Sequence, residues 1–143
     1  MKIDSIKNGI VLDHIKAGRC MLIFQLLHLD ALECPVAILK NVPSKKMGKK
    51  DIIKIGDADV NLDFNAIGYV DPDITVNVIR DDVCVEKKHV ALPEELENVI
   101  KCKNPRCITT IEQELPQVFK LTDPENRVYR CLYCEEKSGQ VSH

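Results

Sequence analysis

Four of the seven cysteines in this chain fall in two tight pairs near its carboxyl end. Cys102 and Cys107 lie in CKNPRC, and Cys131 and Cys134 lie in CLYC. Each short spacing lets one turn of chain aim two sulfurs at a single point, and two such turns facing each other make a tetrahedral site of four thiolates. Four protein ligands leave no open position for water or a reactant. The spacing therefore predicts one structural zinc ion per chain.

The segment around these cysteines has few residues that can build a hydrophobic core. From residue 95 to residue 143 its aromatic side chains are Phe119, Tyr129 and Tyr133. Burial alone would not fold so small a segment, whereas a structural zinc site contributes on the order of 10 kcal/mol to folding. The alternative is four unrelated buried cysteines. It is disfavoured because two paired spacings of this kind rarely arise by accident.

The other three cysteines, Cys20, Cys34 and Cys84, lie within apolar runs. We expect them to be small buried hydrophobic side chains, because no neighbouring group marks any of them as a nucleophile. The sequence also contains no phosphate-binding loop, nucleophile elbow, HExxH pattern or dinucleotide-binding glycine pattern. These observations predict a protein that is not itself an enzyme.

Length and charge exclude several classes of protein. A chain of 143 residues forms one ordinary domain or two small ones. Its net charge of −2 gives no support to non-specific binding of nucleic acid or of an anionic membrane. No apolar run reaches the length of a membrane span, and MKIDSIKNG is not a secretory signal. Seven cysteines without such a signal are typical of reduced thiols, so we expect a cytoplasmic protein without a membrane partner.

Short apolar runs of strand and helix type alternate in the first two thirds of the chain. Their order predicts an α+β, ferredoxin-like two-layer domain, with two helices on one face of a mostly antiparallel sheet. In the stretch 91–100, Leu92-Pro93-Glu94-Glu95 resembles the start of a helix. We therefore expect a short helix that links residues 1–93 to a small zinc-bound β domain, residues 94–143. The expected strands are 9–15, 34–42, 49–56, 73–79 and 82–88, the expected helices are 18–30 and 61–70 (with Asn61 as the cap of the second), and 45–50 is expected to be a solvated loop.

Charged residues stand out at the ends and in the middle of three of these strands. Asp13 and His14 end the first, Lys54 interrupts the apolar run IIKI, and Lys87 and Lys88 end the last. Two ammonium groups and an Asp-His pair suit a phosphate tail with a sugar or base. The alternative is that these residues bind no ligand: the Asp-His pair would be a solvated strand end, and Lys54 would mark an edge strand. Spacing alone favours this alternative.

Five segments in this order resemble the regulatory chain of aspartate carbamoyltransferase over nearly the whole length. The resemblance implies an amino-terminal domain that binds nucleotide effectors and a carboxy-terminal zinc domain that docks on a separate catalytic chain. It also implies that the chain has no catalytic activity of its own. The segments are SIKNGIVLDHI (5–15), VPSKKMGKKDIIKI (42–55), TVNVI (75–79), LPEELENVIKCKNPRCI (92–108) and RCLYCEEK (130–137).

The resemblance implies a nucleotide site on residues 1–93. Asp13 and His14 match the family's pair beside the sugar and phosphates of the nucleotide. Lys54 matches the lysine near the ribose, and Lys87 matches the one that reaches the phosphates. Matching positions near the base are Asp4, Ile6, Val11, Asn77 and Ile79.

Three residues depart from the family pattern or compete with it. Asp82 stands where an aromatic residue often lines the base pocket, and Cys84 replaces an aliphatic one. Both changes leave the base selectivity open. Lys88 is an alternative to its neighbour Lys87 for the phosphates.

The resemblance implies a non-catalytic subunit that senses nucleotides such as CTP and ATP in pyrimidine biosynthesis. Regulatory homodimers would bridge catalytic trimers in a larger hetero-oligomer. The alternative is a zinc-ribbon protein that binds nucleic acid. Residues 95–143, however, carry at least as many acidic as basic side chains and few aromatic ones for stacking, so no nucleic-acid partner is expected.

Overall fold

The computed structural model describes residues 7–138 of the chain. Asp4 and Ile6 of the expected nucleotide site lie outside the described residues. By its backbone contacts the chain divides into two compact units, residues 1–91 and residues 92–143. Within the described residues, no helix is both long enough and apolar enough to cross a membrane.

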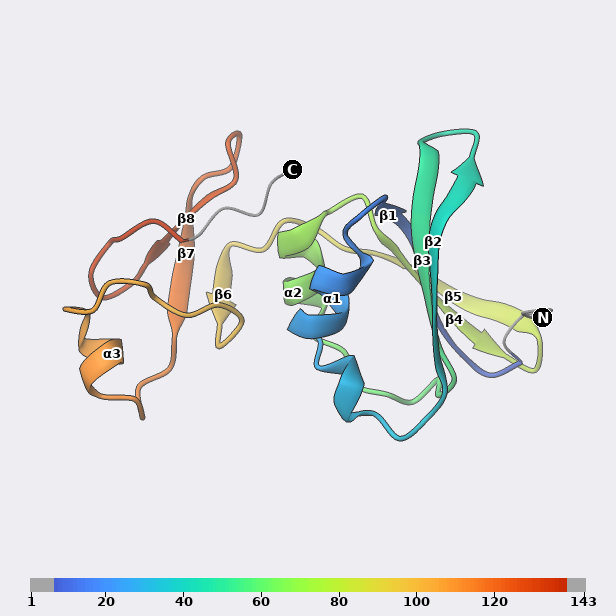
Figure 1. The fold of residues 1–143 in the computed structure, drawn as a ribbon, viewed down its shortest axis with the longest axis horizontal. Coiled ribbons are helices and arrows are strands. Elements are labelled where there is room, and N and C mark those ends of the chain that lie inside the picture. Colours follow the sequence, from blue (N-terminus) through green and yellow to red (C-terminus); the bar gives the residue numbers. More distant parts are fainter. Residues whose placement is uncertain (1–6, 139–143) are drawn as a thin grey trace. The chain divides into compact units, whose positions relative to one another are not determined.

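The first unit is a five-stranded sheet with the strand order β2-β3-β1-β4-β5, in which every neighbouring pair is antiparallel. Two short helices, α1 and α2, contact each other and lie on the same side of this sheet (Figure 1). This arrangement confirms the predicted two-layer α+β fold. The elements are β1 (Gly9–Lys16), α1 (Cys20–Leu26), the 3-10 helix η1 (Leu29–Ala31), β2 (Val36–Ser44), β3 (Gly48–Ile55), α2 (Phe64–Val70), β4 (Thr75–Arg80) and β5 (Val83–His89).

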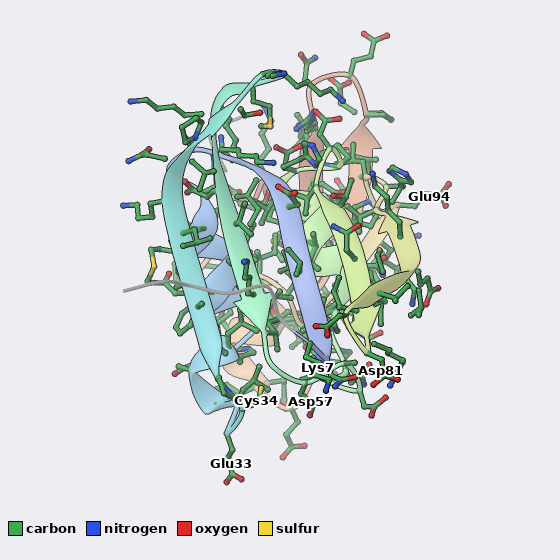
Figure 2. All side chains as sticks on the ribbon, turned by 90° about the vertical axis from the view of Figure 1, so that its right-hand side faces the viewer. Lys7, Glu33, Cys34, Asp57, Asp81 and Glu94 are labelled. Carbon is green, nitrogen blue, oxygen red and sulfur yellow. The ribbon has the colours of Figure 1, made fainter. Side chains whose placement is uncertain are left out.

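The core of the first unit lies between the sheet and the helices. Successive side chains of a strand point to opposite faces, so every second residue of the central strands is buried. Leu12 of β1, Ile53 of β3 and Val76 of β4 are completely buried, as is Ile23 of α1. The intervening residues form the opposite face of the sheet, which no described helix covers and which faces the viewer in Figure 2.

Both helices are shorter than predicted, and in each a local feature of the chain determines where the helix begins or ends. The predicted helix 18–30 ends early because His28 takes a left-handed conformation, with φ 53°, before η1 begins. The second helix starts at Phe64, and its cap is Asp63 and not Asn61 as expected. The Asp63 carboxylate accepts hydrogen bonds from the backbone N–H groups of Asn65 and Ala66, at 3.0 and 3.2 Å.

The second unit contains a three-stranded antiparallel sheet, β6-β7-β8. Leu96, Phe119 and Tyr129, one from each strand, are buried and form its small core. The predicted helix over 91–100 is wrong, because this stretch contains β6 and pairs with β7. Leu96 is paired with Phe119 of β7 and is completely buried in this strand. The elements are β6 (Glu95–Glu97), α3 (Ile108–Ile111), β7 (Val118–Asp123) and β8 (Val128–Cys131).

Replacement of the α2 cap tests how much this short helix depends on it. We expect Asp63→Ala to lower the free energy of unfolding of the first unit by about 1 kcal/mol, because two N–H groups of the first turn lose their acceptor. Asp63→Asn keeps an acceptor and is the matched control. Chemical denaturation followed by circular dichroism measures both. Equal stability of the alanine and asparagine variants would contradict this role.

Candidate functional site

The four paired cysteines converge in the second unit. Their Sγ atoms all lie within 4.8 Å of one another. The sulfurs of Cys102 and Cys134 are 3.5 Å apart, and those of Cys107 and Cys131 are 3.7 Å apart. Zinc–sulfur bonds of about 2.3 Å in a tetrahedron set the sulfurs about 3.8 Å apart. The cluster therefore fits one structural zinc ion, in agreement with the spacing.

Backbone hydrogen bonds shape the loops that carry the ligands. Cys102 precedes α3, and its N–H donates to the side-chain oxygen of Gln117 at 2.9 Å. Cys107 is the residue just before α3, and its N–H donates to the carbonyl of Asn104 at 3.1 Å. Cys131 ends β8 and begins the turn that carries the fourth sulfur. Each pair is thus formed by one turn of chain, as the short spacings require.

The environment of the thiols is uneven. Burial raises the pKa of the Cys102 thiol to about 12, and the neighbouring thiols add to this effect. Burial also acts to raise the pKa of Cys107, but hydrogen bonds from the hydroxyl and backbone of Thr109 outweigh it and lower this pKa to about 7. The Cys107 sulfur and the Thr109 hydroxyl oxygen are 3.1 Å apart. Four thiolates so close together need a cation to balance their charge, and a divalent metal supplies it.

A row of four predicted site residues crosses the sheet face opposite the helices. The register pairs Val11 of β1 with Lys54 of β3 on one side and with Asn77 of β4 on the other. Asn77 is paired in turn with Lys87 of β5. Paired residues share a face, and strands lie about 4.8 Å apart, so the two lysines stand about 14 Å apart at the ends of the row. Ile79 follows Asn77 on the same face of β4.

Asp13 and His14 lie next to this row, in a β-bulge of β1 over residues 12–15. The Asp13 carboxylate accepts a hydrogen bond from the backbone N–H of His14 at 2.6 Å and pairs with the ammonium of Lys50 at 2.9 Å. The His14 ring nitrogen Nδ1 is 3.2 Å from the hydroxyl oxygen of Thr75. Partners on β3 and β4 therefore hold both predicted residues on the face that carries the row.

The charges on this face suit an anion. Burial acts to raise the pKa of the Asp13 carboxyl, but Lys50 and the N–H of His14 outweigh it, so this pKa is below its usual value. The carboxylate is therefore ionised at neutral pH and offsets one cation. Lys50, Lys54 and Lys87 share the face with it, which leaves the surroundings of the row positive.

Lys50 and Thr75 contact the predicted residues but were not expected to do so. The prediction of a solvated loop over 45–50 is wrong for its last residues, because β3 begins at Gly48. Lys50 is four residues before Lys54, and in one strand this spacing puts both on the same face. That spacing was a usable signal. Thr75 is directly paired with Asp13, and this register has no signature in the sequence.

Lys87 and Lys88 point to opposite faces of the sheet. The ammonium of Lys88 lies 4.8 Å from the ring centre of Phe64, at the start of α2, and 3.6 Å from the Glu86 carboxylate. It is therefore on the helix side. Lys87 is paired with Asn77 and lies on the other face. The register makes Lys88 a poor alternative to Lys87.

The expectation that three cysteines are buried holds only for Cys20. Cys34 is half-buried, and Cys84 is exposed. Cys84 lies on the edge strand β5, on the face that no described helix covers, so apolar neighbours in sequence do not bury it. It is paired with Ile79 and follows the turn that contains Asp82.

Loss of one zinc ligand tests the metal centre. We expect Cys102→Ser to contain less than one zinc ion per chain and to unfold the second unit, because the remaining core is too small to fold it. The first unit should stay folded. Elemental analysis and amide NMR spectra measure these effects, with Cys34→Ser as the matched control that keeps its zinc. A zinc-free Cys102→Ser chain with β7 and β8 intact would refute the structural role.

Comparison with known proteins assigns both units. Residues 1–91 match the model of the aspartate carbamoyltransferase regulatory chain, allosteric domain, and residues 94–141 match its metal binding domain. The chain is 51% identical over 136 residues to the aspartate carbamoyltransferase regulatory chain of Clostridium tetani, covering 95% of this chain and 94% of that one. Against the same chain of Bifidobacterium longum the identity is 43% over 138 residues, covering 96% and 99%. The chain therefore belongs to the family of aspartate carbamoyltransferase regulatory chains.

Proposed function

We propose that this regulatory chain, which is not itself catalytic, binds the nucleotide effectors CTP and ATP and transmits their effect to an aspartate carbamoyltransferase catalytic chain. The observation that carries the proposal is the row Lys54–Val11–Asn77–Lys87 with the Asp13–His14 bulge beside it, on a face that no described helix covers. The match of residues 1–91 to an allosteric domain supports it.

The chemistry of the row suits the parts of a nucleoside triphosphate. An ammonium group is a compact charge that binds phosphate oxygens, so Lys87 contacts the phosphates and Lys54 the ribose side of the ligand. Asp13 and His14 lie beside the sugar and phosphates. The base lies against the apolar positions of the face, with Asn77 as a polar contact. The residues assigned to the base are Asp4, Ile6, Val11, Asn77 and Ile79.

The chain would divide the work between its two parts. Residues 1–93 bind the nucleotide, and residues 94–143 dock on the catalytic chain through a surface that zinc keeps folded. Exposed apolar side chains next to the zinc ligands support a docking role: Ile108 after Cys107, and Leu132 and Tyr133 between the last two cysteines. Regulatory chains would form homodimers within a larger hetero-oligomer, as the resemblance to aspartate carbamoyltransferase regulatory chains implies.

Removal of either lysine of the row tests the nucleotide site. We expect Lys54→Ala and Lys87→Ala each to weaken CTP binding about tenfold, because each loses a charge-assisted hydrogen bond worth about 1.5 kcal/mol. Affinity should also fall as salt rises. Lys88→Ala is the matched control and should bind CTP like the original chain. Calorimetry measures all three. If both row variants keep full affinity for CTP and ATP, the assignment fails.

Metal removal tests the division of work. A mercurial thiol reagent should eject the zinc, unfold the second unit and release the catalytic chain, while CTP still binds to the first unit. Size-exclusion chromatography of the complex, with calorimetry on the released chain, measures both effects. Added thiol and zinc should restore the complex. If the zinc-free chain keeps its partner, docking belongs to residues 1–93.

A further inference from the structure

Asp51 of β3 is a completely buried carboxylate on the helix side of the sheet. It accepts backbone hydrogen bonds from two separate segments. Its Oδ2 accepts from the N–H groups of Gly18, at 2.9 Å, and Cys20, at 3.4 Å, and its Oδ1 accepts from that of Asn41 at 3.0 Å. Burial acts to raise its pKa, but the N–H of Asn41 and the other donors outweigh it, so this pKa is below its usual value. The buried group is therefore an anion with satisfied oxygens.

Of these donors, Cys20 is the first residue of α1, and Gly18 lies just before the cap residue Arg19. The first N–H groups of a helix have no partner inside the helix and need an acceptor elsewhere. Arg19, the residue before α1, makes no cap hydrogen bond with its own side chain. Asp51 provides the acceptor from the neighbouring sheet, and its negative charge lies at the favourable end of the helix dipole.

The third donor connects Asp51 to a bulge in the edge strand β2. The β2–β3 register shifts between Leu39 and Val42, and Asn41 lies within this bulge with a left-handed φ of 58°. The β1–β3 register shifts at the same level, between residues 12 and 15. His14 is the left-handed residue of that second bulge, with φ 59°. Both neighbours of β3 therefore bulge beside Asp51.

The segment that follows the β1 bulge, residues 15–18, is paired with or hydrogen-bonded to Asp51. Ile15, the first residue after the bulge, is directly paired with Asp51. Gly18 follows three residues later and donates to the same carboxylate. Asp13, within the bulge, pairs with Lys50, which precedes Asp51 in β3. The chain on the far side of the bulge is thus held by one buried group.

We propose that Asp51 is a positioning residue whose carboxylate couples the bulge of β2 to the bulge of β1 and so sets the positions of Asp13 and His14. Its effect on effector affinity rests on the proposed nucleotide site. The coupling itself does not, because Asp13 and His14 report on it without nucleotide. A purely structural role, in which Asp51 only stabilises α1, would leave these two residues insensitive to changes in β2.

Asn41 allows a test with a residue whose side chain belongs neither to the core nor to the proposed site. It is exposed on the edge strand, and its left-handed backbone is strained for a β-branched residue but not for glycine. We expect Asn41→Val to shift the NMR resonances of Asp13 and His14, to raise the pKa of Asp13 toward its ordinary value and to weaken CTP binding about tenfold. Asn41→Gly is the matched control and should behave like the original chain.

Asp51→Asn should change the same three readouts in the same direction, since it loses the charge and presents an amide donor to backbone donors. Val70→Ala, a core change in α2, controls for loss of stability and should leave Asp13 and His14 unchanged. If the NMR resonances of Asp13 and His14 stay unchanged in folded Asn41→Val, the coupling is overturned. If Asp51→Asn does not fold, the comparison of Asn41→Val with Asn41→Gly decides by itself. If the original chain binds neither CTP nor ATP, the proposed function fails, while the NMR readouts still judge the coupling.

Discussion

Strand alternation is the constraint on which the first unit depends. In a sheet that helices cover on one face, every second side chain of a strand is buried in the core. The other side chains lie on the opposite face and do not contribute to this core. In β1, Ile10 and Leu12 are buried, while Val11 between them lies on the other face. Polar residues can therefore occupy that face without reducing the apolar surface that the core buries. Their mutual positions follow from register, which pairs Val11 with both Lys54 and Asn77.

The second unit depends on a different constraint. Its three short strands bury Leu96, Phe119 and Tyr129, a core too small to offset the conformational entropy of about fifty residues by burial alone. The thiolate cluster adds a free energy of metal binding that the unfolded chain does not have. Ligands from both ends of this unit, Cys102 before α3 and Cys131 at the end of β8, make the metal hold distant segments together. Burial thus stabilises one unit, and burial with metal binding stabilises the other.

Local patterns predicted the features whose cause is local. The alternation in GIVLDHI and the spacing of CKNPRC each specify a structure within a few residues, so the strand β1 and the metal cluster could be expected. Features that depend on a distant partner could not. The stretch 91–100 forms a strand because β7 pairs with it, and Cys84 is exposed because β5 is at the sheet edge. Likewise, only the register shows that Lys87 and not Lys88 shares a face with Asn77, and only the register pairs Thr75 with Asp13.

The β1 bulge explains how two consecutive residues can serve one face. In a regular strand Asp13 and His14 would point to opposite faces, and one of them would enter the core. The extra residue and the left-handed backbone of His14 instead let its ring reach Thr75, the partner of Asp13. Such a conformation costs about 1 kcal/mol or more, so the surrounding structure must stabilise it. The hydrogen bonds of buried Asp51 on the far side of the bulge do so. The sheet is therefore irregular where two consecutive polar side chains share one face, and the cost of that irregularity is offset on its buried face.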